Sequence, residues 1–461
     1  MKRIVLCLST ALLGLVAIPS TPVFAQHTQI TPRAVWTDTD GQHIQAHGGG
    51  ILRVGDTYYW YGEQRRQGVE RESVRYVSCY SSTDLMNWKN EGDVLCLSKP
   101  DSALLIGPNW VLERPKVYRS QSTGKYVMYM HIDGRTPGSN SGYGYARVGV
   151  AVSDSPTGPF SFVRTFRPFG KESRDIGQFI DDDGTPYLIF ESRPTGGFYI
   201  ARLTPDCLDV ADSVAFIHDR LEGGGIVHYR GLYYCVGSGL TGWKPNPNKY
   251  ATATRLEGPW SEFRDLAPAD SCTYGAQSTL LLKVEGSQDT TVVFLADVWR
   301  PDRQWDSRYL WMPCRIGDGS LQVPQPKAWS IDVKTGKHSL ATQFALQNAY
   351  DKQVDNYEKQ KSKFEAQYNR LEDQIDTLQR QAADIQQKAE KHIDKQLDKA
   401  EKHIDKQLDK AEKHIDKQLD KAEKHIDKQK DKLSKKKKQL GKAYDEQKQK
   451  LQQQLDDLQN R

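Results

Sequence analysis

One stretch decides the fold, Leu221-Glu222-Gly223-Gly224-Gly225-Ile226-Val227-His228-Tyr229-Arg230-Gly231-Leu232-Tyr233-Tyr234. The apolar and aromatic runs on either side of Arg230-Gly231 predict a β-hairpin. The three glycines before the first run let the backbone approach a ligand or a neighbouring strand closely. The stretch therefore predicts a buried strand with Glu222 at its head.

The same layout, a turn that leads into an aromatic or β-branched strand, occurs five times in the first three-quarters of the chain. The turns begin at Gly55, Gly124, Asp183, Arg230 and Asp289. Repeats of roughly 50 to 70 residues without helical periodicity predict a propeller built from four-stranded blades. A two-sheet sandwich is the alternative, but sandwiches rarely repeat at this period. Residues 26–340 are therefore expected to form an all-β, five-bladed propeller.

A polar, mostly acidic residue stands 8 to 12 positions before each of these turns. The five residues are His47, Glu113, Asp175, Glu222 and Gln277. In a propeller, each would lie on the innermost strand of its blade, at the mouth of the central funnel. One such residue alone would be explained by capping a strand or pairing with a neighbour. Its repetition in every unit instead predicts one shared site.

Carboxyl groups that face one funnel suit the cleavage of a glycosidic bond. One carboxyl must be protonated to give its proton to the leaving oxygen, while others adjust its pKa and hold the sugar. Burial would raise the pKa of Glu222, which makes it the predicted general acid, with Asp175 as the neighbour that raises its pKa and orients it. Trp243, and either Tyr143 or Tyr145 in a Gly-rich loop, are expected to stack against sugar rings.

Residues 1–25 have the features of a secretory signal peptide. Lys2 and Arg3 precede an apolar run from Ile4 to Ile18, and a small-residue cleavage site ends at Ala25. The mature chain is expected to be secreted or periplasmic, and no later segment is apolar enough to span a bilayer. A net charge of +5 over 461 residues argues against a dedicated nucleic-acid binder. Six cysteines remain without a CxxC pair, which leaves disulfides and free thiols both possible.

Several motifs in residues 30–335 resemble family 43 of the glycoside hydrolases, and most closely its exo-β-1,3-galactanase branch. They are His47-Gly48-Gly49-Gly50, Gly62-Glu63, Leu112-Glu113-Arg114-Pro115-Lys116-Val117, Asp175, Leu221-Glu222-Gly223 and Ser238-Gly239-Leu240-Thr241-Gly242-Trp243. The resemblance implies a five-bladed propeller and an inverting mechanism. It also implies release of galactose from the β-1,3-galactan backbone of arabinogalactans.

The resemblance also implies a role for each matching residue. Glu222 matches the general acid, and Asp175 matches the carboxylate that modulates its pKa. Most of the family carries an Asp general base on the first blade, where this chain has His47 and no carboxylate. The galactanase branch shares this departure. In that branch, the residues around the attacking water are matched here by Gln277 and Glu113. Gln277 could act as a base only as its imidic acid tautomer. The expected substrate contacts are Glu63, Tyr145, Trp243 and His47.

Neither a cofactor nor a metal site is predicted. A calcium ion occurs in the funnel of related propellers, but this sequence shows no ligand cluster that demands one. The alternatives to a galactanase are an α-L-arabinofuranosidase or β-galactofuranosidase of the same family, or a carbohydrate-binding propeller without hydrolytic activity. Glu222 and Asp175 favour an enzyme, whereas the absence of an Asp base on the first blade keeps the binding protein as an alternative.

From about residue 341 the composition shifts to Lys, Gln, Asp and Glu. Apolar residues from Phe364 onward recur at alternating steps of three and four, which is a heptad seam. An 11-residue unit then starts at Ala389, Ala400 and Ala411, a period that favours a straight or right-handed supercoil. Residues 341–461 are therefore predicted to form a coiled-coil stalk, as one helix or a helical hairpin. It would join copies of the enzyme into a homo-oligomer or space the enzyme from a surface; the alternative is a solvated single helix.

Overall fold

The computed structural model describes residues 26–65, 74–105, 109–341, 343–397 and 405–459. The predicted signal peptide lies outside the described residues. The chain divides into two compact units at residue 341. None of the helices in the described ranges is both long enough and apolar enough to cross a membrane.

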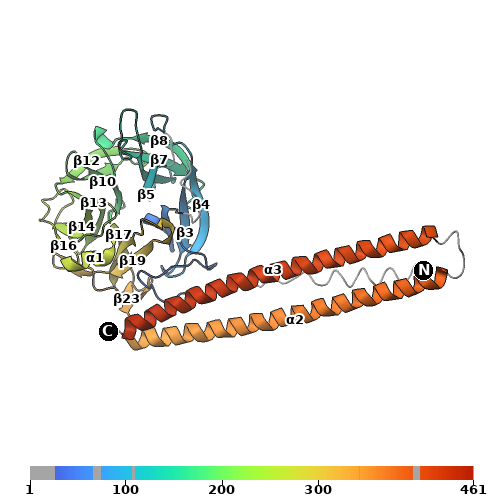
Figure 1. The fold of residues 1–461 in the computed structure, drawn as a ribbon. Helices are drawn as coiled ribbons and strands as arrows, with labels where there is room; N and C mark the ends of the chain where they lie inside the picture. Colours follow the sequence, from blue (N-terminus) through green and yellow to red (C-terminus); the bar gives the residue numbers. More distant parts are fainter. Residues whose placement is uncertain (1–25, 66–73, 106–108, 342, 398–404, 460–461) are drawn as a thin grey trace. The chain divides into compact units, whose positions relative to one another are not determined.

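The first unit is a five-bladed β-propeller whose blades are antiparallel sheets around a common axis (Figure 1). Blade one contains β1 (His47–Val54), β2 (Thr57–Glu63), β3 (Arg75–Ser82) and β4 (Lys89–Leu97). Blade two contains β5 (Val111–Arg119), β6 (Tyr126–Asp133), β7 (Arg147–Ser153) and β8 (Ser161–Phe166). Blade three contains β9 (Ile176–Ile180), β10 (Pro186–Ser192), β11 (Gly197–Leu203) and β12 (Val210–Ile217). Blade four contains β13 (Leu221–Tyr229), β14 (Leu232–Gly239), β15 (Lys249–Ala253) and β16 (Arg264–Asp265).

Blade five differs from the prediction, because its sheet has three strands in the described part of the chain rather than four. They are β17 (Gln277–Glu285), β18 (Thr290–Val298) and β19 (Arg308–Pro313). The chain then forms two separate hairpins, β20 (Arg315–Gly317) with β21 (Ser320–Gln322) and β22 (Trp329–Asp332) with β23 (Lys337–Leu340). A short helix, α1 (Cys272–Gly275), precedes β17.

The first strands of the blades close a ring around the axis. Strand β1 contacts β5, β5 contacts β9, β9 contacts β13, β13 contacts β17, and β17 returns to β1. All five predicted turns join an inner strand to the second strand of its blade. Between the first and last blades, the buried ring of Trp60 packs against Trp88, Tyr309 and Trp311 with centroids 4.7–5.3 Å apart. All six cysteines of the described chain are free.

A β-bulge follows the predicted site residue on several inner strands. The pairing register shifts between His47 and Gly50 on β1, and at the equivalent places on β5, β13 and β17. The residue after the site residue has a left-handed backbone on three blades, at Gly48 (φ 57°), Arg114 (φ 52°) and Gly223 (φ 65°). A bulge of this kind bends its strand and changes the direction in which the neighbouring side chains point.

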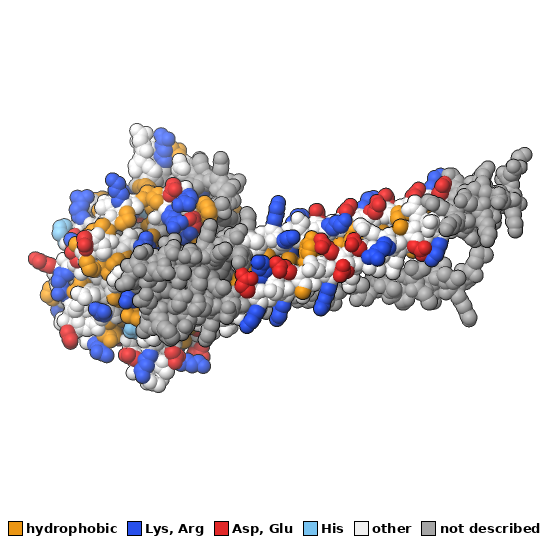
Figure 2. Space-filling model, turned by 60° about the horizontal axis from the view of Figure 1, so that its bottom comes forward, with side chains coloured by type: hydrophobic (Ala, Val, Ile, Leu, Met, Phe, Trp, Pro, Cys, Tyr) orange, Lys and Arg blue, Asp and Glu red, His pale blue; other side chains and the backbone are white. Residues whose placement is uncertain are grey.

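The second unit consists of two long helices, α2 (Gln343–Leu397) and α3 (Asp405–Gln459). The Tyr357 hydroxyl donates to the carbonyl of Leu440 at 3.0 Å, and Lys437 lies over the ring of Tyr368. These contacts make the pair antiparallel, so the chain adopts the hairpin rather than the single helix. Lys and Arg side chains are interspersed with Asp and Glu along its described surface (Figure 2). The coiled-coil packing itself stays a prediction.

Candidate active site

A cavity of about 240 Å³ lies at the mouth of the propeller funnel, and we refer to it as the funnel cavity. It is lined by Glu63, Glu113, Arg114, His131, Tyr143, Arg174, Asp175, Arg193, Glu222, Leu240, Gly242, Trp243, Gln277 and Trp299. Its site residues come from the starts of the inner strands: Glu113 is the third residue of β5, Glu222 the second of β13 and Gln277 the first of β17. Asp175 immediately precedes β9. Six of the eight residues predicted for the site therefore meet in one cavity.

Glu222 has the environment of a carboxyl that stays protonated at neutral pH. Only 6% of the residue is exposed. Burial, with a smaller contribution from the charge of Asp175, raises the pKa of Glu222 to about 8, although Arg114 and Arg193 oppose the rise. The Arg193 guanidinium lies 3.3 Å from Oε2 of Glu222 and also 3.3 Å from Oε1 of Glu191. Sharing Arg193 between two carboxyls limits how strongly it stabilises the ionised form of Glu222.

Asp175 is fixed by the buried cation of Arg114. Its Oδ2 lies 2.6 Å from Nε of Arg114. Nη1 of Arg114 donates to the carbonyl of Ser278 at 3.0 Å. One guanidinium on β5 thus ties together residues from the third and fifth blades. The ion pair with Arg114 holds Asp175 as a charged neighbour of Glu222.

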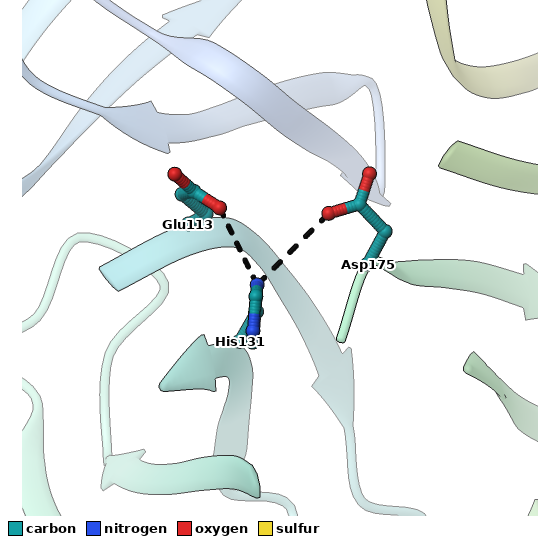
Figure 3. A group of neighbouring side chains, drawn as sticks. All are labelled: Glu113, His131 and Asp175. Atoms are coloured by element: carbon teal, nitrogen blue, oxygen red, sulfur yellow. Dashed lines mark ion pairs between the residues drawn. The ribbon is translucent and has the colours of Figure 1, made fainter. Parts of the chain in front are cut away.

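His131, on β6, lies between Glu113 and Asp175 (Figure 3). Its Nδ1 lies 3.4 Å from Glu113 and 3.9 Å from Asp175, and its Nε2 lies 3.0 Å from Asp133. Burial alone would lower the pKa of His131, but Asp133 and Glu113 raise it to about 10. Burial alone would raise the pKa of Glu113, but the contact with His131 lowers it overall. Glu113 is therefore an ionised carboxylate held by an imidazolium.

The same three groups have the spacing of a metal site. Ligand atoms of Glu113, His131 and Asp175 all lie within 4.8 Å of one another. A histidine binds a metal through the lone pair of a neutral imidazole, whereas Asp133 and Glu113 raise the pKa of His131. A cation bound here would therefore have to displace the proton on Nδ1 of His131.

Glu63, at the end of β2, is a second buried carboxyl with a raised pKa. Burial raises its pKa to about 8, against the opposing charge of Arg65, with which it forms an ion pair. Arg65 also lies 3.9 Å from Glu113. Glu63 therefore offers a carboxyl that can donate or accept a hydrogen bond at the wall of the funnel cavity.

Gln277 connects the predicted acid to an aromatic wall. Its Nε2 donates to Oε1 of Glu222 at 3.0 Å, and its Oε1 accepts a hydrogen bond from the indole of Trp299 at 2.8 Å. The ring of Trp299 packs edge-on against Trp243 at 5.3 Å. Trp243 is 40% exposed, and its contact with a sugar ring stays a prediction.

Two predicted substrate contacts lie outside the lining of the funnel cavity. His47 is fully buried, with its Nδ1 3.1 Å from Asp297 and its ring stacked on Tyr309. The Tyr145 hydroxyl points to Asp101 and to Thr165. Tyr145 is followed by Ala146, which has a left-handed backbone. Tyr143, and not Tyr145, lines the cavity. The Tyr143 hydroxyl donates to Glu113 at 3.3 Å.

Several cavity residues had no signal in the sequence that assigned them to the site. His131 and Trp299 lie at the far ends of second strands, where β6 and β18 bring them beside the starts of β5 and β17. Arg193 follows the end of β10 in the same way. The signal that the three share is a polar or aromatic residue at the end of the second strand of a predicted hairpin.

The comparisons with known proteins agree with this geometry. The family model described as glycosyl hydrolases family 43 matches residues 46–265. The exo-β-1,3-galactanase of Phanerochaete chrysosporium, solved with β-1,3-galactotriose, is 38% identical, with 68% of this chain and 71% of that chain covered and a TM-score of 0.61. A structure of that enzyme with galactose is 39% identical over the same shares, with a TM-score of 0.61.

An exo-β-1,3-galactanase from Clostridium thermocellum is 35% identical, covers 68% of this chain and 69% of its own, and has a TM-score of 0.61. No curated protein matched the sequence. The identity and coverage of the solved structures, together with the family model, confirm the resemblance found in the sequence. This chain therefore belongs to glycoside hydrolase family 43, in its exo-β-1,3-galactanase branch.

Proposed function

We propose that this glycoside hydrolase releases galactose from the ends of β-1,3-galactan, the backbone of arabinogalactans, with inversion at the anomeric carbon. The observation that carries the proposal is the buried Glu222, whose raised pKa keeps it protonated inside a cavity lined by other carboxyls. The binding of β-1,3-galactotriose and galactose by the Phanerochaete enzyme supports the choice of sugar.

In the proposed reaction, Glu222 gives its proton to the glycosidic oxygen as the bond to the anomeric carbon breaks. Asp175 raises the pKa of this acid and, anchored by Arg114, keeps its own position while the charge on Glu222 changes. Once ionised, Glu222 is stabilised by Arg193 and by the amide of Gln277. Asp175 therefore favours the protonated form of Glu222, and Arg193 and Gln277 stabilise the ionised form.

Water attacks the opposite face of the sugar, and we assign Gln277 and Glu113 to its surroundings. Gln277 has one amide N–H bound to Glu222 and a second one left to donate to the water or to a sugar hydroxyl. Glu113 is ionised and can accept the proton that the water loses. Glu63, Trp243 and Tyr143 would hold the galactose unit. No cofactor takes part in these steps.

The proposal is tested by the products from β-1,3-galactan and from α-L-arabinofuranosides or β-galactofuranosides. We expect galactose from the first and no sugar from the others, and proton NMR should show the α-anomer of galactose first. The Glu222→Gln variant should bind the substrate and lose at least 100-fold in turnover. Arabinose or galactofuranose as the product would identify one of the alternative activities, and binding of galactan without any product would identify a carbohydrate-binding protein.

We also propose that residues 1–25 direct the protein out of the cytoplasm and are removed near Ala25. This follows from the sequence alone, and polysaccharide in the surroundings of the cell would then be accessible to the enzyme. N-terminal sequencing of the exported protein would test it. A first residue other than one close to Gln26 would contradict the cleavage site.

A further inference from the structure

Trp299 is linked to the predicted acid through the amide of Gln277. It follows β18, two residues beyond Asp297, and its indole Nε1 lies 2.8 Å from Oε1 of Gln277. On the other side of the amide, Nε2 lies 3.0 Å from Oε1 of Glu222. Indole, amide and carboxyl thus form one line of hydrogen bonds across the wall of the funnel cavity.

The chemistry of the indole determines which way the amide of Gln277 points. An indole N–H is only a donor, so the atom of Gln277 that faces Trp299 must be the amide oxygen. The amide nitrogen must then face Glu222, where it can only donate. When Glu222 is protonated, its Oε1 accepts this hydrogen bond as the carbonyl oxygen, and the proton belongs on Oε2, which still has a lone pair for the N–H of Arg193 at 3.3 Å.

We propose that Trp299 is a positioning residue for the acid: its indole N–H locks the Gln277 amide so that the transferable proton of Glu222 stays on Oε2. The inference rests on the proposed role of Glu222 as general acid. Without the indole N–H, the amide could turn and present its oxygen to Glu222. The acid would then place its proton on Oε1, in a hydrogen bond to Gln277 and away from the glycosidic oxygen.

The turned amide also changes the balance between the two protonation states of Glu222. An N–H that donates to the carboxylate favours the ionised form, whereas an amide oxygen that accepts from the carboxyl favours the protonated form. The other charged groups around Glu222 would stay as they are. They are Asp175 before β9, Arg114 on β5, Glu191 on β10 and Arg193 after β10.

The test is the pH dependence of kcat/KM for β-1,3-galactotriose with the Trp299→Phe variant. Phenylalanine keeps an aromatic ring against Trp243 but removes the N–H together with part of the volume of the indole. We expect kcat to fall about tenfold with KM nearly unchanged. The alkaline limb, where Glu222 loses its proton, should move up by about one pH unit. Trp243→Phe is the matched control for the position of the alkaline limb. It alters the cavity wall without removing the hydrogen bond from Trp299 to Gln277.

A second variant, Gln277→Leu, removes the amide and should also move the alkaline limb upward. Adding Trp299→Phe to it should cause no further movement, since both act through one hydrogen-bond line. An alkaline limb of Trp299→Phe that coincides with the wild-type limb would overturn the proposal. So would an equal movement in Trp243→Phe, which would indicate general loosening. Turnover that survives in Glu222→Gln would instead refute the role of Glu222 as acid, so the two failures are distinguishable.

Discussion

Replacing the acid should stabilise the propeller at alkaline pH. The pKa of Glu222 is about 8 in the folded protein and 4.5 in the absence of these surroundings. Between these two values the unfolded chain is ionised while the folded protein still holds the proton, so the free energy of unfolding falls as pH rises. Above pH 8 the folded protein carries a buried carboxylate. Glu222→Gln removes this group and with it the loss of stability.

The size of the effect follows from the same pKa difference. Each pKa unit corresponds to about 1.4 kcal/mol, so the full difference amounts to about 5 kcal/mol. Burial of all but 6% of Glu222 leaves little solvent to screen it. The variant also loses the ion pair with Arg193, which is partly exposed and regains water. We therefore expect Glu222→Gln to be about 3 to 5 kcal/mol more stable than the wild type at pH 9 and nearly equal to it at pH 4.

Urea unfolding followed by tryptophan fluorescence measures this in the full-length protein. All 10 tryptophans lie between residues 36 and 329, so the signal reports the propeller and not the helices. The matched control is Glu257→Gln, which changes an exposed carboxyl in a turn. Equal stability of Glu222→Gln and wild type at pH 9 would refute the reasoning. A gain that is the same at pH 4 and pH 9 would refute it too, because the gain would then have no link to the proton.

Two further predictions concern packing. A Cβ on Gly177 would lie 1.9 Å from the carbonyl oxygen of Gly224 on the neighbouring inner strand, so Gly177→Ala should lower the free energy of unfolding by about 3 kcal/mol in the same urea assay. Gly142→Ala, which has open space, should leave it unchanged. Leu378 and Ile385 of the hairpin are 49% and 55% exposed. We expect a second copy to cover them, so light scattering should give an oligomer for the full chain and a monomer for residues 26–341; equal monomer masses would contradict this.

The fold could be predicted because its signals are local and repeated. A turn followed by an aromatic strand is specified by a few adjacent residues, and five copies at similar spacing define a propeller. The three-stranded fifth blade could not be predicted in this way, because closing the ring depends on contacts between the two ends of the unit. The sequence allowed both a single helix and a helical hairpin for residues 341–461. The heptad and 11-residue patterns do not specify whether the chain turns back on itself.

Four residues of the candidate site could be predicted because their position repeats. Glu113, Asp175, Glu222 and Gln277 share one position per blade, and that position is the mouth of the funnel. Tyr143 and Tyr145 are two aromatic residues two positions apart in one loop, so the sequence does not distinguish which of them faces the cavity. In the structure Tyr143 lines the cavity, while the hydroxyl of Tyr145 contacts Asp101 and Thr165.

The partners that give these residues their properties lie far away in the sequence. Arg114 and Asp175 are 61 positions apart, and Gln277 and Glu222 are 55 positions apart. A pKa depends on burial and on charges within a few ångströms, and the inner strands bring these groups together only when the ring closes. The repeat therefore indicates Glu222 as one candidate among the residues at the funnel mouth, and the partners that set its pKa come from the fold. In our proposal, the oxygen of Glu222 that carries the proton is set by Trp299, which joins the site from the end of a different strand.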